Sequence, residues 1–467
     1  MEDRVMRKAL LCVGLVVLFA SSVQAAPVGP GGRIYLSRSW YRSMGDNVTQ
    51  LLRVDVDSSW DLLTDHGAIA SVGNDYNLND EHVSATSPEV LHPRANADGT
   101  ATGGDGSICT AGYYDSASHC RLYKVTSGGT VSTIHQGAGS EPSSNPTNPA
   151  PAFTGGTNET EYCVDATGIA TGRAESICFG GGTYRSRGIW YDMDSNDSLE
   201  DAGDLHYYGG YIYNQSCTDD LEVGAGPNGT GGGFYSSGGY RMQYQPYTGD
   251  GTNHSWGSAY VYYAWHQEGF TDTSSGLRFC FRGDGIAVGD TDGDGNMDVY
   301  FTTTESYSNT SPGIVRLADL DGTGKLDFED DNYETFDDLA TMIYDDDTLG
   351  GSANDINNSC DSELVYDPTT GKWTLLVIER GSAYSSTDGR IMAFELADNG
   401  EFAGGEDAFK LIATVDTGVG EGPNGLVLYG VEFDADPSGA IPEPASVLLL
   451  GTGVLGVFGY LRRRRMH

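Results

Sequence analysis

An all-β fold is the class that this sequence predicts, and three observations lead to it. Short apolar or alternating runs are broken throughout the chain by Gly, Asn, Asp and Ser, a pattern typical of strands joined by turns. The 467 residues include 66 glycines and 28 tyrosines, with few long helical patterns. A weak internal repeat recurs roughly every 50 to 75 residues, which favours a β-propeller of about six or seven blades with a short loop-helix insertion.

The repeat is a strand-like run that ends in two acidic residues separated by one other residue. Copies end at Asp57, Asp194, Asp321 and Asp436. In a propeller each blade buries its faces against its neighbours, so the ring has no long exposed edge. Residues 27–436 form this acidic body, and two tandem β-sandwich domains are the alternative architecture for it.

The N-terminal residues 1–25 predict a signal peptide. Arg4, Arg7 and Lys8 supply positive charge, and an apolar run follows from residue 9 to residue 20. Small residues then lead to Ala25, after which a signal peptidase would cut. A membrane anchor is the alternative, but the run is too short to cross about 30 Å of hydrocarbon. The chain is therefore expected to be exported.

The C-terminal residues 441–467 contain three features in order. An Ile-Pro-Glu-Pro motif at 441–444 is followed by an apolar segment at 447–461 and by four arginines at 462–465. The apolar segment predicts a transmembrane segment, and the arginines would hold its end on the cytoplasmic side. An ordinary tail anchor is the alternative, but such an anchor needs no Pro-Glu-Pro.

This arrangement resembles the PEP-CTERM sorting domain. The resemblance implies recognition by an exosortase and removal of the tail, as in Gram-negative bacteria that make extracellular polysaccharide. Before processing, the chain would be anchored in the membrane through the tail. After processing, it would lie on the outer surface or in the extracellular matrix.

The charge balance limits the possible partners. Acidic residues number 66 against 26 basic residues, which gives a formal net charge of −40. Such a surface repels nucleic acid and anionic membranes, so we expect neither as a partner, and the tail is the predicted membrane contact. The same surface attracts divalent cations.

Cysteines predict disulfides in an exported protein. The chain has eight, and seven remain once Cys12 leaves with the signal peptide. Cys109 with Cys120 and Cys163 with Cys178 each flank a short stretch that could be a hairpin, so these are the predicted pairs. An odd number leaves at least one cysteine free or paired with another chain.

The strongest local motif runs from residue 290 to residue 298, between two strand-like runs. Acidic residues occupy the first, third, fifth and ninth positions of the loop, and glycine occupies the sixth. Calcium takes six to eight oxygen ligands at about 2.3–2.6 Å, and alternate residues of a tight loop can point their oxygens inward. The predicted calcium ligands are Asp290, Asp292, Asp294, Asn296 and Asp298.

This loop resembles the strand-loop-strand calcium site of integrin-type FG-GAP repeats. Its twelfth position is Phe301, within a strand-like run, where an EF-hand has an acidic residue. FG-GAP repeats are propeller blades, so the resemblance implies the fold that the internal repeat predicts. A metal-free hairpin is the alternative, in which the alternating carboxylates would repel one another.

A second loop, residues 319–330, resembles an EF-hand or dockerin loop. Tyr333, Phe336, Leu339, Ala340 and Ile343 follow at helical spacing and predict a helix. Dockerins carry two such units and bind a cohesin, and a second unit is not found, so a cohesin partner is not expected. A purely structural loop is the alternative. The predicted ligands are Asp319, Asp321, Thr323, Lys325, Asp327 and Asp330, and weaker candidates elsewhere are Asp192, Asp194, Asn196, Asp55, Asp57, Asp434 and Asp436.

Enzyme chemistry leaves little trace in the sequence, which has no HExxH, GxSxG or P-loop motif. Paired carboxylates can hydrolyse glycosides, but among 66 acidic residues no pair stands out. The favoured interpretation is a non-enzymatic surface or matrix protein with a calcium-stabilised propeller that binds an extracellular polysaccharide or a surface protein. The alternative is a hydrolase or lyase that acts on extracellular polysaccharide with the same scaffold.

Overall fold

A computed structural model describes residues 27, 29–40, 46–77, 89–90, 94–95, 101–102, 108–113, 120–125, 129–136, 162–165, 176–181, 186–191, 205–211, 220–224, 226, 233–238, 241–249, 254–256, 260–263, 278–279, 283–303, 310–311, 313–317, 340–345, 356, 359–379, 388–404, 408–415 and 426–434. The regular structure of these residues is β-strand, and no helix occurs among them. The predicted all-β class is therefore confirmed for the described part.

The described strands form six antiparallel sheets of four or five strands, which we number 1 to 6 along the chain. Sheet 1 contains β29 (Leu426–Asp434), β1 (Gly32–Trp40), β2 (Asp46–Val56) and β3 (Leu62–Asn77). Sheet 2 contains β4 (Glu89–Val90), β7 (Ile108–Tyr113), β8 (Cys120–Val125) and β9 (Val131–Gln136). Sheet 3 contains β10 (Tyr162–Asp165), β11 (Ser176–Gly181), β12 (Ser186–Tyr191) and β13 (Leu205–Tyr211).

The second half of the chain supplies the other three. Sheet 4 contains β14 (Asp220–Gly224), β15 (Gly233–Gly238), β16 (Arg241–Gly249), β17 (His254–Trp256) and β18 (Tyr260–Tyr263). Sheet 5 contains β20 (Gly283–Gly289), β21 (Asp298–Thr303), β23 (Gly313–Leu317) and β24 (Ala340–Asp345). Sheet 6 contains β25 (Ser359–Asp367), β26 (Lys372–Glu379), β27 (Gly389–Glu395) and β28 (Phe409–Val415). Two short pairs are β5 (Arg94–Ala95) with β6 (Ala101–Thr102), and β19 (Arg278–Phe279) with β22 (Thr310–Ser311).

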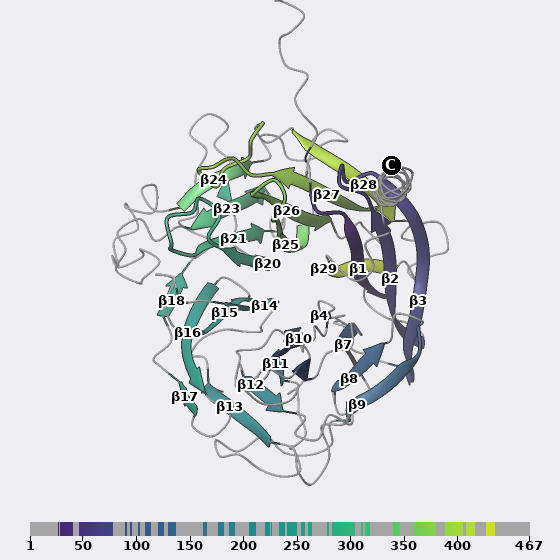
Figure 1. Cartoon of the computed structure of the whole chain (residues 1–467). Helices are drawn as coiled ribbons and strands as arrows, with labels where there is room; N and C mark the ends of the chain where they lie inside the picture. Colours follow the sequence, from purple (N-terminus) through teal and green to yellow (C-terminus); the bar gives the residue numbers. More distant parts are fainter. Residues whose placement is uncertain are drawn as a thin grey trace, which may run out of the picture.

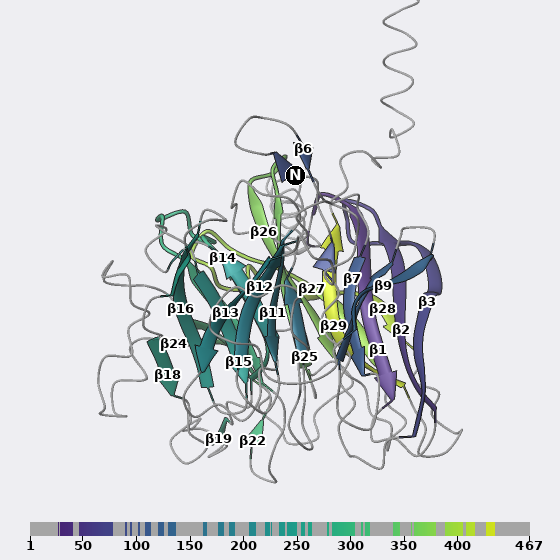
Figure 2. The same cartoon turned by 90° about the horizontal axis from the view of Figure 1, so that it is seen from below.

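Each numbered sheet contacts the next one along the chain. β3 contacts β7, β7 contacts β10, β10 contacts β14, β14 contacts β20, and β20 contacts β25. β25 contacts β29 of sheet 1, and β29 also contacts β4 of sheet 2. Figure 1 shows the sheets around a common centre, with β4, β10, β14, β20, β25 and β29 nearest to it. Figure 2, turned by 90°, shows that many of the strands run roughly along one axis.

Sheet 1 joins the two ends of the described body. β29 pairs with β1 from Arg33 opposite Asp434 to Trp40 opposite Leu426, with one irregularity after Ser37. The Arg33 guanidinium lies 3.5 Å from the Asp434 carboxylate. The last strand of the body thus pairs with the first and lies on its inner side, at the edge of sheet 1 nearest the common centre.

The core lies between sheets. Sheets 1 and 6 share one apolar cluster, sheets 5 and 6 share a second, and sheets 1 and 2 share a smaller third. Phe394 of sheet 6 is fully buried in the second cluster and stacks on Phe402 with ring centroids 4.4 Å apart. Because the strands alternate side chains between their two faces, sheet 6 contributes to both of its neighbours.

Trp60 closes the turn between β2 and β3 and is fully buried. Its ring packs on Phe433 with centroids 5.4 Å apart, and its φ of 58° is unusual for a residue with a side chain. Gly29 donates its N–H to Ser58 O at 2.9 Å, and a Cβ on Gly29 would lie 2.4 Å from the indole ring. The Trp60 ring therefore packs between the segment at Gly29 and Phe433 of β29, and it leaves no space for a side chain at Gly29.

The strands nearest the centre approach closely in sheets 5, 6 and 1. A Cβ on Gly285 in β20 would lie 2.5 Å from Asp361 Cα in β25. The Asp361 carboxylate accepts hydrogen bonds from Ser362 N at 2.8 Å and from Val431 N in β29 at 2.7 Å. A glycine and a buried carboxylate thus permit three neighbouring strands to pack backbone against backbone.

Asp367 organises the hairpin turn between β25 and β26. Its carboxylate accepts hydrogen bonds from Thr369 N at 2.8 Å and from Thr370 Oγ1 at 2.8 Å. Gly371, with a φ of 73°, donates its N–H to Asp367 O at 2.8 Å. Burial alone would raise the pKa of Asp367, but the hydrogen bonds from Thr370 and Thr369 lower it below its ordinary value.

Replacing Asp367 with Ala is expected to lower the free energy of unfolding by about 1–2 kcal/mol at pH 7, since the turn loses both hydrogen bonds. The folded-state pKa is the lower one. The contribution is therefore present above the unfolded pKa of about 3.9 and is lost as the pH falls through the folded value. Urea unfolding at pH 7 and pH 3 measures this, with Asp367→Asn as the variant that keeps one acceptor. An equal difference at both pH values would contradict it.

Two sequence-based expectations are wrong. The predicted helix does not reach Ala340 and Ile343, because these residues belong to β24, which pairs with β23. The rest of the predicted helix lies outside the described residues.

The predicted disulfides also disagree with the strand register. Cys109 lies opposite Lys124 and Cys120 opposite Tyr113, which separates the two cysteines by about 13 Å along the strands. Cys163 lies opposite Gly180 and Cys178 opposite Asp165. Neither pair is directly opposed, and a disulfide needs Cα atoms within about 7 Å.

Candidate cation site

The candidate site is the loop between β20 and β21 of sheet 5. The two strands are in register up to Gly289 opposite Asp298, so the chain between them must reverse within the loop. Gly293 and Gly295 have φ values of 75° and 92°, which residues with a side chain rarely adopt. The glycine at the sixth loop position therefore makes the sharp turn for which the sequence motif predicts it.

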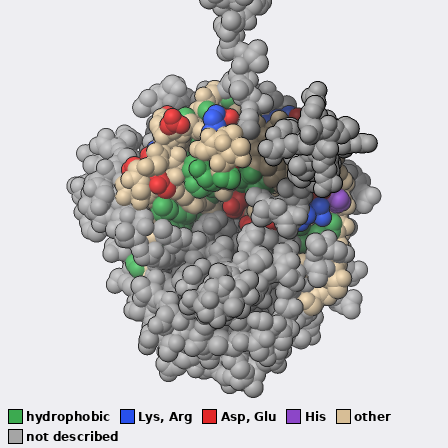
Figure 3. All heavy atoms as spheres, viewed as in Figure 1, with side chains coloured by type: hydrophobic (Ala, Val, Ile, Leu, Met, Phe, Trp, Pro, Cys, Tyr) green, Lys and Arg blue, Asp and Glu red, His purple; other side chains and the backbone are tan. Residues whose placement is uncertain are grey.

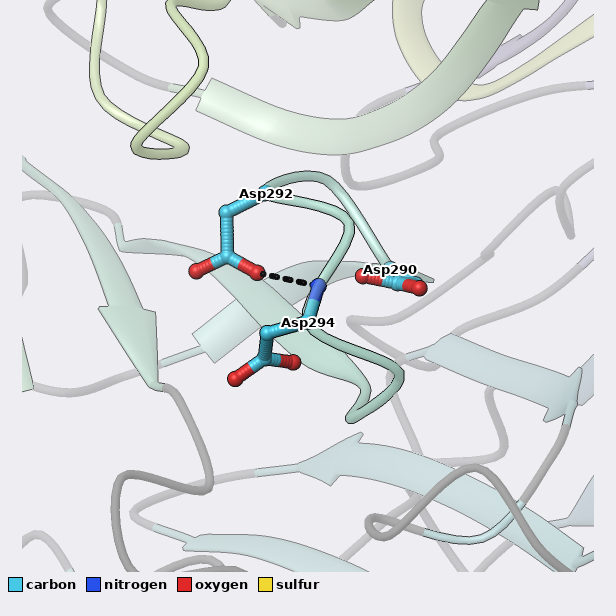
Figure 4. A group of neighbouring side chains, drawn as sticks. All are labelled: Asp290, Asp292 and Asp294. Carbon is cyan, nitrogen blue, oxygen red and sulfur yellow. Dashed lines mark hydrogen bonds between the residues drawn. The ribbon is translucent and has the colours of Figure 1, made fainter.

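Three of the predicted ligands come together in this loop. One oxygen each from Asp290, Asp292 and Asp294 lies within 4.8 Å of the others (Figure 4). Since calcium–oxygen distances are about 2.4 Å, two oxygens on one calcium ion are at most about 4.8 Å apart. The group could hold a metal ion of this kind.

Backbone hydrogen bonds fix the three carboxylates. Asp290 Oδ2 accepts from Gly295 N at 3.1 Å, Asp292 Oδ1 from Asp294 N at 3.2 Å, and Asp294 Oδ1 from Asn296 N at 2.7 Å. Asn296 also donates its side-chain amide to Asp294 Oδ2 at 3.0 Å. Asn296, a predicted ligand, thus supports Asp294 directly.

The surroundings of one oxygen of the group, Asp290 Oδ1, fit a bound cation. This oxygen is buried and has no hydrogen-bond partner among the described residues. A buried carboxylate oxygen without a partner is unfavourable, and a bound cation would remove that penalty. The chemistry of the donor set, three carboxylates in a tight loop, suits a hard divalent cation.

Asp298, the fifth predicted ligand, lies outside this group. It is 3% exposed, and its Oδ2 accepts from Thr291 N at 3.1 Å and from the Thr291 hydroxyl. Its Oδ1 accepts from Arg316 Nη2 at 2.7 Å. Burial raises the pKa of the Asp298 carboxyl, while Arg316 and Thr291 act in the opposite direction.

The loop is connected to sheet 6 through Tyr300. The Thr291 and Tyr300 hydroxyl oxygens are 2.7 Å apart, and Tyr300 donates to Gly400 O at 2.6 Å. Burial raises the pKa of Tyr300 well above its ordinary value, and the nearby Asp298 adds to this. The phenol therefore stays protonated and remains a donor.

Sequence reasoning missed Arg316, Thr291 and Tyr300. Arg316 comes from β23, 24 residues after Asp292, and contacts that carboxylate at 2.7 Å. Loop spacing carries no information about a side chain that arrives from another strand. An arginine in an otherwise apolar, buried strand, Gly-Ile-Val-Arg-Leu, is the signal that could have indicated it.

Most of the other predicted ligands lie outside the part of the chain that the structure describes. Residues 319–330, with Asp319, Asp321, Thr323, Lys325, Asp327 and Asp330, lie outside the described residues, as do Asp192, Asp194, Asn196 and Asp436. Leu317, just before that second loop, lies opposite Val299, so both loops leave sheet 5 at the same end.

The weaker candidates in sheet 1 already have protein partners. Asp55 accepts two hydrogen bonds from Arg53 at 2.7 and 2.8 Å, and Asp57 accepts from Ser59 N and Asp61 N at the turn. Although burial opposes it, Arg53 and His66 lower the pKa of Asp55. Asp434 pairs with Arg33. These acids serve strands and turns.

Acidic side chains lie at the surface of the described part, beside hydrophobic side chains (Figure 3). Within the described residues, no helix is long and apolar enough to span a membrane. The predicted signal peptide, residues 1–25, and the predicted transmembrane segment, residues 447–461, lie outside the described part.

Comparison with known protein families identifies one segment of the chain. The search of curated proteins found no match to the chain. Among solved structures, the chain is distantly similar to exotype rhamnogalacturonan lyase YesX, with 11% identity, 80% of this chain and 73% of the other covered, and a TM-score of 0.27. The model of the PEP-CTERM protein-sorting motif matches residues 440–465, which confirms the resemblance seen in the sequence. This C-terminal motif implies an exported, exosortase-sorted protein of the cell surface.

Proposed function

We propose that the chain is a surface or matrix protein whose body is a calcium-stabilised β-propeller of six sheets. Two observations support the propeller: consecutive sheets are in contact from sheet 1 to sheet 6, and sheet 6 contacts sheet 1 again through β25 and β29. The pairing of the last strand with the first would supply the closure that a ring of sheets requires. Tandem sandwiches would not need it.

The geometry of the carboxylate loop is the observation that supports calcium binding. Asp290, Asp292 and Asp294 would hold the ion, with the unpartnered Asp290 Oδ1 as one ligand. The ion would neutralise mutual repulsion in the loop and fix the end of sheet 5, where the loop contacts sheet 6 through Tyr300. Asp298 would act as a support for the loop through Thr291.

The body would act as a binding or adhesion module outside the cell. The sorting motif supports the location, and the net charge of −40 supports partners bridged by cations or recognised by neutral groups. An extracellular polysaccharide and a surface protein are the two partner classes. A glycan array probed in calcium and in EDTA separates them, because a protein partner gives no signal on it.

Calcium is expected to raise the thermal unfolding midpoint of the chain from residue 26 onward, measured in mild detergent. At about 1 mM calcium, a site with a Kd near 0.1 mM adds roughly 1.4 kcal/mol, and a tenfold tighter site roughly 2.7 kcal/mol. Asp290→Asn and Asp292→Asn should remove the shift, since each removes a ligand charge. EDTA should reverse it in the unaltered chain.

The matched control is Asp398→Asn, which removes one exposed carboxylate outside the group. It should leave the calcium shift intact. A chain whose midpoint is the same in calcium and in EDTA has no structural calcium site, and the assignment would be withdrawn.

A further inference from the structure

A buried cationic side chain lies against the carboxylate loop. Arg316 is 8% exposed, and its Nη2 atom lies 2.7 Å from Asp292 Oδ2 and 2.7 Å from Asp298 Oδ1. Such charge-assisted contacts are the stronger hydrogen bonds of proteins. The guanidinium thus shares one carboxylate with the proposed calcium site and holds a second that the loop motif alone would assign to calcium.

Sheet 6 fixes this guanidinium from the other side. Gly400, with a φ of 75°, lies in the turn after β27, and a Cβ there would be 2.5 Å from Arg316 Nε and 2.6 Å from Cζ. The turn is held by Gly400 N donating to Ala397 O at 2.9 Å and by Tyr300 donating to Gly400 O. Arg316 therefore has little room to move away when an ion binds.

The guanidinium is charged in the folded protein. Arginine keeps its charge at any pH at which proteins fold. A bound divalent cation would consequently lie near a permanent positive charge.

Two opposite effects on calcium affinity are conceivable. Arg316 could orient Asp292 for the ion, or it could repel the ion. Orientation does not depend on Arg316 alone, because Asp294 N donates to the other Asp292 oxygen at 3.2 Å. Repulsion is direct: a unit charge about 5 Å from a divalent ion weakens binding about tenfold even at the dielectric constant of water. Repulsion is therefore the larger effect.

We infer that Arg316 is an internal counter-ion of the loop, a specificity-determining residue that balances Asp292 and Asp298 without a metal and limits the affinity of the site for calcium. This inference rests on the proposed calcium site. With Arg316 in place, the loop would keep its shape at low calcium concentration, because the guanidinium already neutralises part of its negative charge. At higher concentration, bound calcium would neutralise more of that charge.

The test compares calcium titrations by calorimetry of the chain from residue 26 onward, with and without Arg316→Gln. We expect the variant to bind calcium about tenfold more tightly. It should also unfold earlier in EDTA and show a larger rise of its midpoint in calcium. A merely structural arginine would lower stability without tightening calcium binding, so the affinity separates the two roles.

Two further variants serve as controls. Arg316→Lys keeps the charge and should leave the affinity within about threefold of the unaltered chain, clearly less than the tenfold change expected for Arg316→Gln. Lys372→Gln removes one positive charge from a side chain that is 46% exposed and paired with Glu395, and it should leave calcium binding unchanged.

Each outcome decides a different question. If neither the unaltered chain nor Arg316→Gln binds calcium, the proposed calcium site itself fails. If the unaltered chain binds and Arg316→Gln binds equally or more weakly, the calcium site stands and the counter-ion is overturned. Failure of Arg316→Gln to fold in millimolar calcium would also overturn it, because the ion should replace the missing charge.

Discussion

Trp60→Ala is expected to lower the free energy of unfolding by about 4 kcal/mol, the range for a buried aromatic side chain replaced by alanine. The ring is fully buried, packs on Phe433 and occupies the space that Gly29 leaves by having no side chain. Its removal would open a cavity between the N-terminal segment and sheet 1. Urea unfolding followed by circular dichroism measures the loss.

Trp60→Phe is the matched control for this prediction. The indole Nε1 atom is buried without a hydrogen-bond partner among the described residues, so its removal breaks no bond. A smaller ring that still contacts Phe433 should cost less than about 2 kcal/mol. Equal losses in the two variants would show that the ring does not support the turn.

Gly285→Ala is expected to be the next most damaging substitution, at about 3 kcal/mol. The added Cβ would lie 2.5 Å from Asp361 Cα and 2.8 Å from Asp361 C, and backbone atoms cannot turn aside as a flexible side chain can. β20 and β25 would have to separate, which loosens the cluster between sheets 5 and 6. Hydrogen exchange in β20 and β25 should rise together with the loss of stability.

Gly67→Ala provides the comparison, since it tests backbone strain without contact. Gly67 has a φ of 62°, and an added Cβ meets nothing within 4 Å. Strain alone should cost about 1–2 kcal/mol and leave exchange in β20 and β25 unchanged. Should Gly285→Ala behave like Gly67→Ala, the close approach of sheets 5 and 6 would not be a constraint on the sequence.

The sequence predicted the class and the loop because both depend on short-range patterns. Alternating runs and turn residues are local, and so is the spacing that brings Asp290, Asp292 and Asp294 together. The role of Gly295 could be predicted because the sharp turn of the loop itself requires a positive φ at this position. These features need no knowledge of other strands.

The errors arose where distant strands decide the outcome. Asp298 stays a predicted ligand by its loop spacing, but that spacing did not indicate its contact with Arg316 from β23. Ala340 and Ile343 fit a helical pattern, but pairing with β23 makes them a strand. The cysteine pairs assumed hairpins whose register could not be read from the sequence. In each case the deciding neighbour lies outside the local window.

The pairing of β1 with β29 has a consequence for the order of events during export. Arg33 and Asp434 contact each other across 401 residues, a very long chain separation. Pairing over such a distance is slow, and β1 presents open backbone groups until its partner arrives. The sorting tail begins at residue 440, only a few residues after β29 ends at Asp434. If the tail anchors the chain as we propose, the time before its removal would also be the time available to close sheet 1, and earlier release would free a chain with an open, association-prone edge.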